Sequence, residues 1–477
     1  MTQSGTRFHP AFIAVELFSL LKGVGGFYVI LFILKASSTA TWVMIGRYLI
    51  VAITIIGIIS TILKWFFHRY ELRYNTIVIR NGIFVKNQHT VAIDKIHNHL
   101  SNSTFIHKWF GLTSLTLETA ATGDLAPFQF PVITEREKAR ILAHIEPKHS
   151  EEIEETTVPL SLNKTVHFRS TKKDMLKASF TSLSFLAIFP LLSALYSNLA
   201  NFFELEETAE SALDYLLIHW WMLIVLFTIA LGLSVVIGYI KTSIKYGNYM
   251  ISDDNVRIYI EKGIGHYTSF SIQKHRVQAV IVEQSFLKRL LGLAAVKLVC
   301  VGDGSEPGQE TSSLYPFMPK HEAYQLLQTI LPGYHIEEYM KRFPVKVLWL
   351  KLLQPYYVTI LAVIGLLLFK REWLWAAAVI FALSIANRIL DYWFTSYIHH
   401  GRTVQIRKGG FTNETYVTHR ERIQQITVSH SWLQRKFGVA TISFANKANP
   451  LHISQLQGVS KEEAGTFFTW YHKKALN

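Results

Sequence analysis

The sequence has little charge, a single cysteine and none of the common catalytic signatures. Because Cys300 is the only cysteine, the chain has no intrachain disulfide and no thiolate metal cluster. It contains no nucleophile-elbow GxSxG, no HExxH zinc motif and no Walker phosphate-binding loop. No pair of carboxylates recurs between its repeated segments. We therefore predict no catalytic residue, no metal and no cofactor.

Hydrophobic residues, by contrast, are abundant. They make up 50% of the chain, whereas charged residues make up only 17%. A helix needs about twenty apolar residues to cross roughly 30 Å of hydrocarbon. Six such stretches occur in three close pairs, at 11–34, 43–67, 176–200, 214–240, 347–369 and 373–397. We predict an α+β integral membrane protein with six transmembrane helices in three hairpins, the first retained as an anchor because it is too long for a signal peptide.

Basic residues gather on one side of the predicted spans. Lys and Arg that flank membrane helices are retained on the cytoplasmic side, and here they are frequent beside the span ends that face the N-terminus and the polar segments. The loop 201–214, between the third and fourth spans, has five acidic residues and no Lys or Arg. We therefore predict a multi-pass protein of the cell membrane with its N-terminus and the segments after each hairpin in the cytoplasm.

Two glycines and a cation recur three times at fixed spacing. The glycines are 29 residues apart in each copy, and a cation followed by a β-branched residue lies 16 residues before the second glycine. The copies are Gly82, Lys95 and Gly111; Gly263, Arg276 and Gly292; and Gly409, Arg422 and Gly438. Constant spacing is typical of a tandem repeat. We predict positive φ at the first glycine of each copy, in a turn after a strand, and a left-handed helix end at the second.

Each copy is predicted to be a β-rich module closed by a helix. Strand patterns over 76–85, 90–100 and 114–120 precede a helix over 134–146, which begins with the capping pair Thr134 and Glu137. The other copies end in helices at 319–330 and 460–474. The predicted domains are hairpin 1 (1–67), module 1 (68–147), an acidic linker (148–168), hairpin 2 (169–240), module 2 (241–331), a linker with hairpin 3 (332–397) and module 3 (398–477).

The repeated signature and the hairpins resemble a known family. The cation with its β-branched neighbour, the fixed glycine spacing and the hairpin before every copy are similar to those of the bacterial PH-like, membrane-flanked domain proteins, in particular the large members with three modules per chain. The resemblance covers nearly the whole chain. It implies a strongly bent β-sheet or partial barrel closed by a helix in each module, and a smaller single-module PH-like membrane protein as partner. The second copy departs furthest, because no aromatic residue precedes Gly292 and a polar loop follows at 302–312.

Two groups of charged residues are candidates for function. Lys95, Arg276 and Arg422 are tentative contacts for anionic lipids or a partner protein, since basic residues beside a membrane attract anionic lipids at about 1 kcal/mol per charge. The alternative is a solvent-facing or salt-bridged position that the fold requires. Arg388 and Asp391 are polar residues near the cytoplasmic end of the sixth span, where their spacing of three residues lets them pair on one helix face.

These observations favour a non-enzymatic scaffold. Three cytoplasmic PH-like modules would bind partner proteins or anionic headgroups at the inner leaflet, and the chain itself could oligomerise. A transporter or export component that uses the six spans is the alternative, since transporters are often built from repeated segments. A membrane enzyme is the third hypothesis. Nucleic acid is not expected as a partner, because the basic residues lie beside the spans and no nucleic-acid-binding motif is present.

Overall fold

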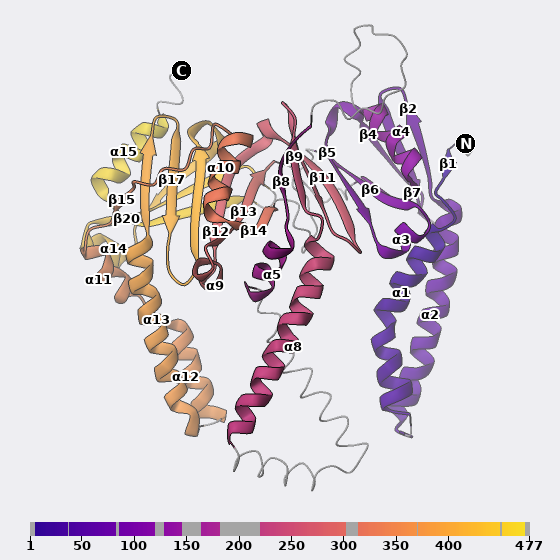
Figure 1. Cartoon of the computed structure of the whole chain (residues 1–477), viewed down its shortest axis with the longest axis horizontal. Helices are drawn as coiled ribbons and strands as arrows, with labels where there is room; N and C mark the ends of the chain where they lie inside the picture. The colour runs from indigo at the N-terminus through magenta and orange to yellow at the C-terminus, as the bar shows by residue number, and fades with distance from the viewer. Residues whose placement is uncertain are drawn as a thin grey trace. The chain divides into compact units, whose positions relative to one another are not determined.

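Strands and helices follow the same order three times along the chain (Figure 1). The computed structural model describes residues 5–36, 38–82, 85–119, 128–145, 164–181, 220–301, 313–369, 371–448 and 451–472. The chain folds into two compact units. The first comprises Met1–Lys164 with Tyr259–Gln273, and the second comprises Thr165–Ile258 with Lys274–Asn477. The chain crosses from the second unit into the first within β10 (Arg257–Lys262).

The first unit contains the first hairpin and the first module. Its elements are β1 (Thr6–Arg7), α1 (Phe12–Tyr28) with a π-helical turn (Val29–Leu34), α2 (Thr41–Phe67), β2 (Arg69–Arg73), β3 (Thr76–Asn81), β4 (Asn87–Ala92), a 3-10 turn (Ile93–Lys95), β5 (Ile96–Ser103), α3 (Phe105–Trp109), β6 (Leu112–Thr119), β7 (Phe128–Thr134), α4 (Glu135–Ile145) and β11 (Tyr267–Gln273). Strands β1 to β4 form one antiparallel sheet in chain order, and β5 pairs with both β6 and β11.

The second unit contains the rest of the second repeat and all of the third. From the second repeat it has β8 (Thr165–Arg169), α5 (Lys172–Thr181), α8 (Trp220–Tyr246), β9 (Met250–Asp253), a 3-10 turn (Lys274–Arg276), β12 (Val277–Gln284), α9 (Phe286–Leu290), β13 (Leu293–Cys300), β14 (Ser313–Pro319) and α10 (Lys320–Ile330). From the third it has β15 (Lys341–Arg342), α11 (Lys346–Leu352), α12 (Tyr357–Phe369), a 3-10 turn (Arg371–Trp373), α13 (Leu374–Phe394), β16 (Ser396–His400), β17 (Thr403–Lys408), β18 (Asn413–His419), a 3-10 turn (Arg420–Arg422), β19 (Ile423–Ser429), α14 (Trp432–Phe437), β20 (Val439–Asn446), β21 (His452–Ser460) and α15 (Lys461–His472).

A short strand before each hairpin pairs with the strand that follows it. In the first module Arg7 lies opposite Arg69, and in the third Lys341 lies opposite Tyr397. Strand β8 pairs with β9 in the same antiparallel manner. In the chain, each predicted hairpin therefore lies between the first and second strands of its module. The domain limits given above remain predictions. They leave out the short strand before each hairpin, which the pairing assigns to the module.

Apolar side chains fill the space between the sheets and the closing helix. In the first module, Tyr70, Leu115 and Phe130 pack with Ile141 of α4. In the second unit one core continues across the second and third modules, with Ile281 of β12 and Tyr416 of β18 in the same cluster. The helices predicted at the ends of the modules are confirmed. The backbone N–H of Glu137 donates to Thr134 Oγ1 at 3.2 Å, as the capping pair predicts.

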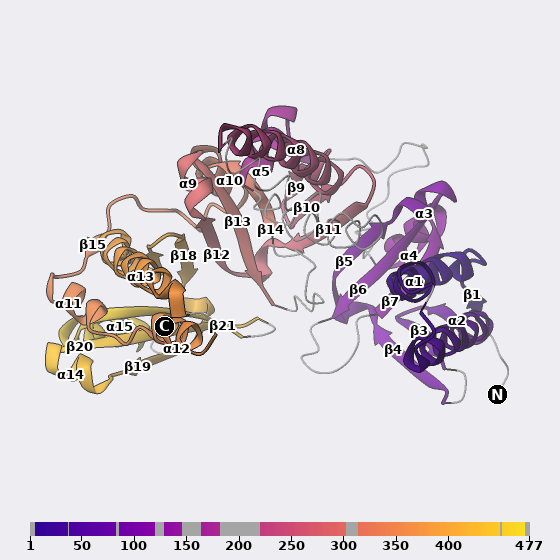
Figure 2. The same cartoon turned by 90° about the horizontal axis from the view of Figure 1, so that it is seen from below.

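Among the described residues, four helical segments are long and apolar enough to cross a membrane: Phe12–Ile33, Thr41–Phe67, Lys346–Leu368, which has a break within it, and Arg371–Phe394. Helix α1 packs beside α2, and α12 beside α13 (Figures 1 and 2). Helix α8 covers the fourth predicted span from Trp220 onward. Residues 182–219, with most of the third predicted span, lie outside the described residues. The predicted total of six spans therefore remains a prediction.

The fifth predicted span is not one continuous helix. Helix α11 ends at Leu352 and α12 begins only at Tyr357. Pro355 explains the break, because proline lacks a backbone N–H and disfavours helical geometry in the residue before it. Val347 and Leu350 of α11 are buried in the core of the third module. The prediction of a single helix over 347–369 is therefore wrong, since its first turns belong to the module.

Five of the six repeated glycines have the predicted backbone. Gly111, Gly292 and Gly438 have φ of 64°, 67° and 66°, and Gly82 and Gly263 have φ of 109° and 102°. Gly409 contradicts the prediction, because the positive φ in the third copy is at Gly410. Gly409 is needed for space instead: a Cβ there would lie 2.0 Å from Cβ of Phe394.

Candidate anion-binding site

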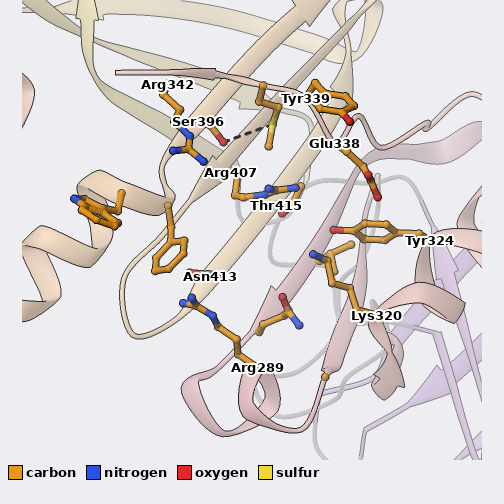
Figure 3. A pocket seen from close by; sticks show the side chains of 16 residues that line it. Arg289, Lys320, Tyr324, Glu338, Tyr339, Arg342, Ser396, Arg407, Asn413 and Thr415 are labelled. Carbon is orange, nitrogen blue, oxygen red and sulfur yellow. Dashed lines mark hydrogen bonds between the residues drawn. The ribbon is translucent and has the colours of Figure 1, made fainter. Parts of the chain in front are cut away.

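A polar cavity of about 570 Å³ lies between the second and third modules, inside the second unit (Figure 3). Its basic side chains are Arg289, Lys320, Arg342 and Arg407, and Glu338 is its carboxylate. The cavity also reaches Trp393 and Phe394 at the end of the last membrane helix. These residues lie close together because β12 of the second module pairs with β18 of the third.

Regular secondary structure fixes the direction of several side chains in the cavity. Lys320 and Tyr324 are four residues apart on α10 and so lie on one face of the helix. Asn413 and Thr415 are two residues apart on β18 and point to the same side of the strand. Arg407 extends from the adjacent strand β17 toward Tyr324 (Figure 3).

The cations of the cavity outnumber its one carboxylate, Glu338. In the part of the chain that the structure describes, no ion pair joins Arg289, Lys320 or Arg407 to a carboxylate. Burial lowers the pKa of the Lys320 ammonium, and the positive charges of Arg407 and Arg289 lower it further against the opposite effect of Glu338. An anion placed among these groups would relieve their mutual repulsion.

Hydrogen-bonding groups complete the lining. The Tyr324 hydroxyl and the Thr415 side chain line the cavity together with Arg407. The side-chain oxygen of Asn413 is buried and has no hydrogen-bond partner among the described residues. The guanidinium of Arg289 lies 3.8 Å from the ring centroid of Phe394, which holds it beside the membrane helix. The cavity thus offers guanidinium and ammonium donors for a phosphate and an acceptor for a hydroxyl.

The three cations predicted from the repeat occupy equivalent places in the fold. Lys95, Arg276 and Arg422 each end a 3-10 turn that leads into a strand. Lys95 is largely exposed and pairs with Asp94 at 3.3 Å. None of the three lines the cavity.

Lys95 lies at the end of β5 that is distant from the membrane helices. The strand after Lys95 has eight residues and spans about 26 Å at 3.3 Å per residue. Its other end leads through α3 to Leu112, which packs with Phe12 and Trp65 of the hairpin. Direct contact between Lys95 and lipid remains a prediction, and this separation counts against it.

A second repeated cation was missed in the sequence although its signal is present. Lys108, Arg289 and Arg435 each lie three residues before the second glycine of their copy. The structure places them on the short helices α3, α9 and α14. Searching every column of the repeat for charge would have found Arg289. Lys320 and Arg407 have no such signal, because the corresponding positions in the other copies are not uniformly basic.

Arg388 and Asp391 bind separate partners and not one another. Arg388 donates to the backbone carbonyls of Lys351, Leu352, Gln354 and Pro355, at 2.6–3.3 Å. These carbonyls are freed by the break between α11 and α12. Asp391 accepts from Lys351 Nζ at 2.5 Å. The pairing predicted from their spacing is wrong, because the break gives each residue a stronger local partner.

The comparison with known proteins agrees with the repeated architecture. The family model of the bacterial PH domain matches residues 19–149, 194–333 and 348–475. The chain belongs to the bacterial PH domain family. It is also 23% identical over 492 residues to the UPF0699 transmembrane protein YdbT of Bacillus subtilis (strain 168), with 99% of each chain covered. The resemblance inferred from the glycines and hairpins is confirmed, and the chain is a membrane protein with repeated bacterial PH-like domains.

Proposed function

We propose that this chain is a non-enzymatic, multi-pass scaffold of the cell membrane with its modules in the cytoplasm, and that the cavity of the second unit binds an anionic, phosphate-bearing headgroup. The observation that carries the proposal is the excess of positive charge in the cavity, where four cations, Arg289, Lys320, Arg342 and Arg407, accompany one carboxylate, Glu338. Phe394 and Trp393 bring the cavity beside the end of α13, where a lipid headgroup is within reach. The second repeat, which departs furthest in sequence, supplies Arg289 and Lys320.

Charge distribution supports the orientation. The formal charge of +14 is concentrated beside the span ends next to the modules, while the loop 201–214 is acidic. The cytoplasmic face of a bacterial membrane is the side on which Lys and Arg are retained. Protease protection in sealed inside-out and right-side-out vesicles would test this orientation independently of any ligand.

A binding experiment with the intact protein tests the cavity. The protein is purified in a neutral detergent and titrated with short-chain phosphatidylglycerol, with short-chain phosphatidylcholine and with glycerol phosphate. We expect Arg407→Gln to weaken binding of phosphatidylglycerol about 10- to 100-fold, since a hydrogen bond to a charged group contributes about 1.5–3 kcal/mol. Arg402→Gln is the matched control, because it removes the same charge from an exposed side chain outside the cavity.

Each outcome of this titration has a clear meaning. Equal binding of both lipids, or no effect of Arg407→Gln, would show that the cavity is not an anionic-lipid site. Binding of glycerol phosphate as tight as that of the lipid would identify a soluble phosphate compound as the ligand. The scaffold proposal would fail separately, if purification from gently solubilised membranes recovered the chain alone.

A smaller single-module PH-like membrane protein is the proposed heterologous partner. The family resemblance supports it, and no described feature of the fold opposes it. Crosslinking in native membranes followed by purification should recover a second, smaller protein of the same fold.

The spans support an anchoring role more than a transport role. The arginines of α2 and α13 cap backbone carbonyls: Arg47 donates to Leu31, Lys35 and Ala36, and Arg388 to the break after α11. A transport path would use such charges for a substrate near the middle of the membrane. Solute flux in proteoliposomes that Arg388→Ala abolished would favour the transport alternative.

A further inference from the structure

The same strand pairing joins each module to the next. Strand β5 pairs antiparallel with β11, and β12 pairs antiparallel with β18. Equivalent residues differ by 181 between the first and second copies and by 146 between the second and third, as the glycines Gly111, Gly292 and Gly438 show. By this numbering, the pair Leu100 and Phe270 is equivalent to the pair Ile281 and Tyr416. Both junctions therefore have the same register.

Two strands of this pattern are left at the edges of their sheets. Among the described strands, β4 has only β3 as a neighbour and β19 has only β20. Strand β4 is the first-module equivalent of β11 and β18. Strand β19 is the third-module equivalent of β5 and β12. At each internal junction, a strand equivalent to β19 pairs with a strand equivalent to β4. In a single chain, β4 and β19 themselves each keep one edge without a neighbouring strand among the described strands.

The composition of these edges favours pairing. Strands β4 (NQHTVA) and β19 (IQQITVS) contain no Lys, Arg, Asp, Glu or Pro. Edge strands of soluble proteins usually carry such residues because they block the addition of another strand. Edge strands β7 and β14 each contain proline within the strand. Strand β21 lacks these residues too, so it is the repeat equivalence, and not composition alone, that singles out β4 and β19.

The surroundings of β19 match those of the paired strand β12. The Tyr471 hydroxyl donates to the carbonyl of Gln424 at 2.9 Å, so the exposed edge begins at the next residue. On the neighbouring helix, Trp432 is 69% exposed. It is the equivalent of Phe286, whose ring meets that of Phe411 across the second junction at 6.4 Å. Phe286 thus makes an aromatic contact at the internal junction, whereas its equivalent in the third module, Trp432, is exposed.

We propose that copies of this chain join head to tail, with β19 of one copy paired antiparallel to β4 of the next. The register of the internal junctions places Thr427 opposite His89 and Gln425 opposite Val91. Each addition leaves one β4 and one β19 free, so this heterologous contact produces rings or open filaments. Anchoring in one bilayer raises the effective concentration of the strands and favours the contact.

Disulfide crosslinking tests the register directly. Two differently tagged full-length chains are co-expressed, one with Thr427→Cys and the other with His89→Cys, and the membranes are treated with a mild oxidant. Opposed residues of antiparallel strands have Cα atoms about 4.5–5.5 Å apart, which lies within the usual disulfide range of about 4.4–6.8 Å. We expect a covalent dimer that carries both tags. The control replaces Thr427→Cys by Gln455→Cys, an exposed position on β21 at the other edge of the same sheet.

A second variant tests the contact without a disulfide. Lysine in an edge strand blocks strand addition, so Thr427→Lys should reduce the mass measured in gentle detergent to that of the 54.7 kDa monomer. Thermal unfolding like that of the unmodified chain confirms that each variant folds. The proposal is overturned if the Thr427–His89 product is no more abundant than the Gln455 control, if Thr427→Cys links only to a different protein, or if Thr427→Lys leaves the mass unchanged.

Discussion

Asn446 is a buried polar residue that links the second and third modules by hydrogen bonds. Its side chain is fully buried, with 0% exposed. The amide nitrogen lies 2.9 Å from Thr418 Oγ1, 3.1 Å from the Arg422 carbonyl and 3.4 Å from the Gln278 carbonyl. Its side-chain oxygen accepts a hydrogen bond from the Tyr416 hydroxyl. Asn446→Ala would remove all of these contacts at once.

The expected loss of stability follows from the groups that lose their partner. The Gln278 carbonyl keeps the hydrogen bond from Thr418 Oγ1 at 2.6 Å, whereas the Tyr416 hydroxyl and the Arg422 carbonyl lose Asn446. A buried polar group without its partner costs about 1–3 kcal/mol. We therefore expect opening of this junction to become easier by about 3 kcal/mol, which is on the order of a hundredfold in the opening equilibrium.

The single cysteine provides the assay. Cys300 is 4% exposed and lies opposite Val277, next to Gln278. A maleimide can reach its thiol only when this region opens, so the labelling rate under native conditions reports the opening equilibrium. We expect Asn446→Ala to raise the labelling rate of the purified protein roughly a hundredfold. Gln425→Ala, an exposed substitution on β19, should change it by less than about threefold.

Two results would refute this reasoning. A labelling rate for Asn446→Ala within a factor of about three of the original would mean that the buried hydrogen bonds do not hold the junction. An equal increase for Gln425→Ala would mean that labelling reports some motion other than opening at Asn446. The intrinsic reactivity of the thiol, measured in denaturant, must be the same in all three proteins.

Glycine substitutions should separate space from backbone conformation. Gly409→Ala should lower the free energy of unfolding by about 3 kcal/mol, because its Cβ would collide with Phe394. Gly438→Ala should lower it by only about 1 kcal/mol, because it strains φ without a collision. Equal shifts of the melting temperature would contradict this. Burial lowers the pKa of both His399 and His452, so protonation favours the unfolded chain. Their stabilising contribution is present above the ordinary histidine pKa of 6.5 and falls as pH drops below it through the folded values. The melting temperature should therefore fall between pH 7.5 and 5.5, and His452→Gln should make that fall smaller; a constant melting temperature would argue against the burial.

Local signals in the sequence predicted local structure well. The pair Thr134 and Glu137 predicted the start of α4, and the backbone N–H of Glu137 indeed donates to Thr134 Oγ1 at 3.2 Å. The glycine at the end of α14 has the left-handed backbone that its position in the repeat indicated. These predictions succeeded because a cap or a helix end is decided by residues within a few positions of one another.

Features that depend on contacts between residues far apart in the sequence could not be predicted from these local signals. The cavity is made by Arg289 and Lys320 of one module and Arg407 of the next, and only the β12–β18 pairing brings them together. The break after α11 was missed because hydropathy counts apolar residues and does not distinguish a span from a helix buried in a module. Gly409 was misjudged because the close approach of Phe394 is a tertiary contact.

The insertion of the first hairpin between two paired strands couples folding to membrane insertion. The strand Thr6–Arg7 leaves the ribosome before the hairpin, yet its partner strand Arg69–Arg73 follows it. The first sheet of the module can close only after the polypeptide has entered the bilayer and returned to the side from which it started. If the hairpin fails to insert, the edge of β2 stays without its partner strand β1. Chaperones and proteases act on chains with such exposed, unpaired strands.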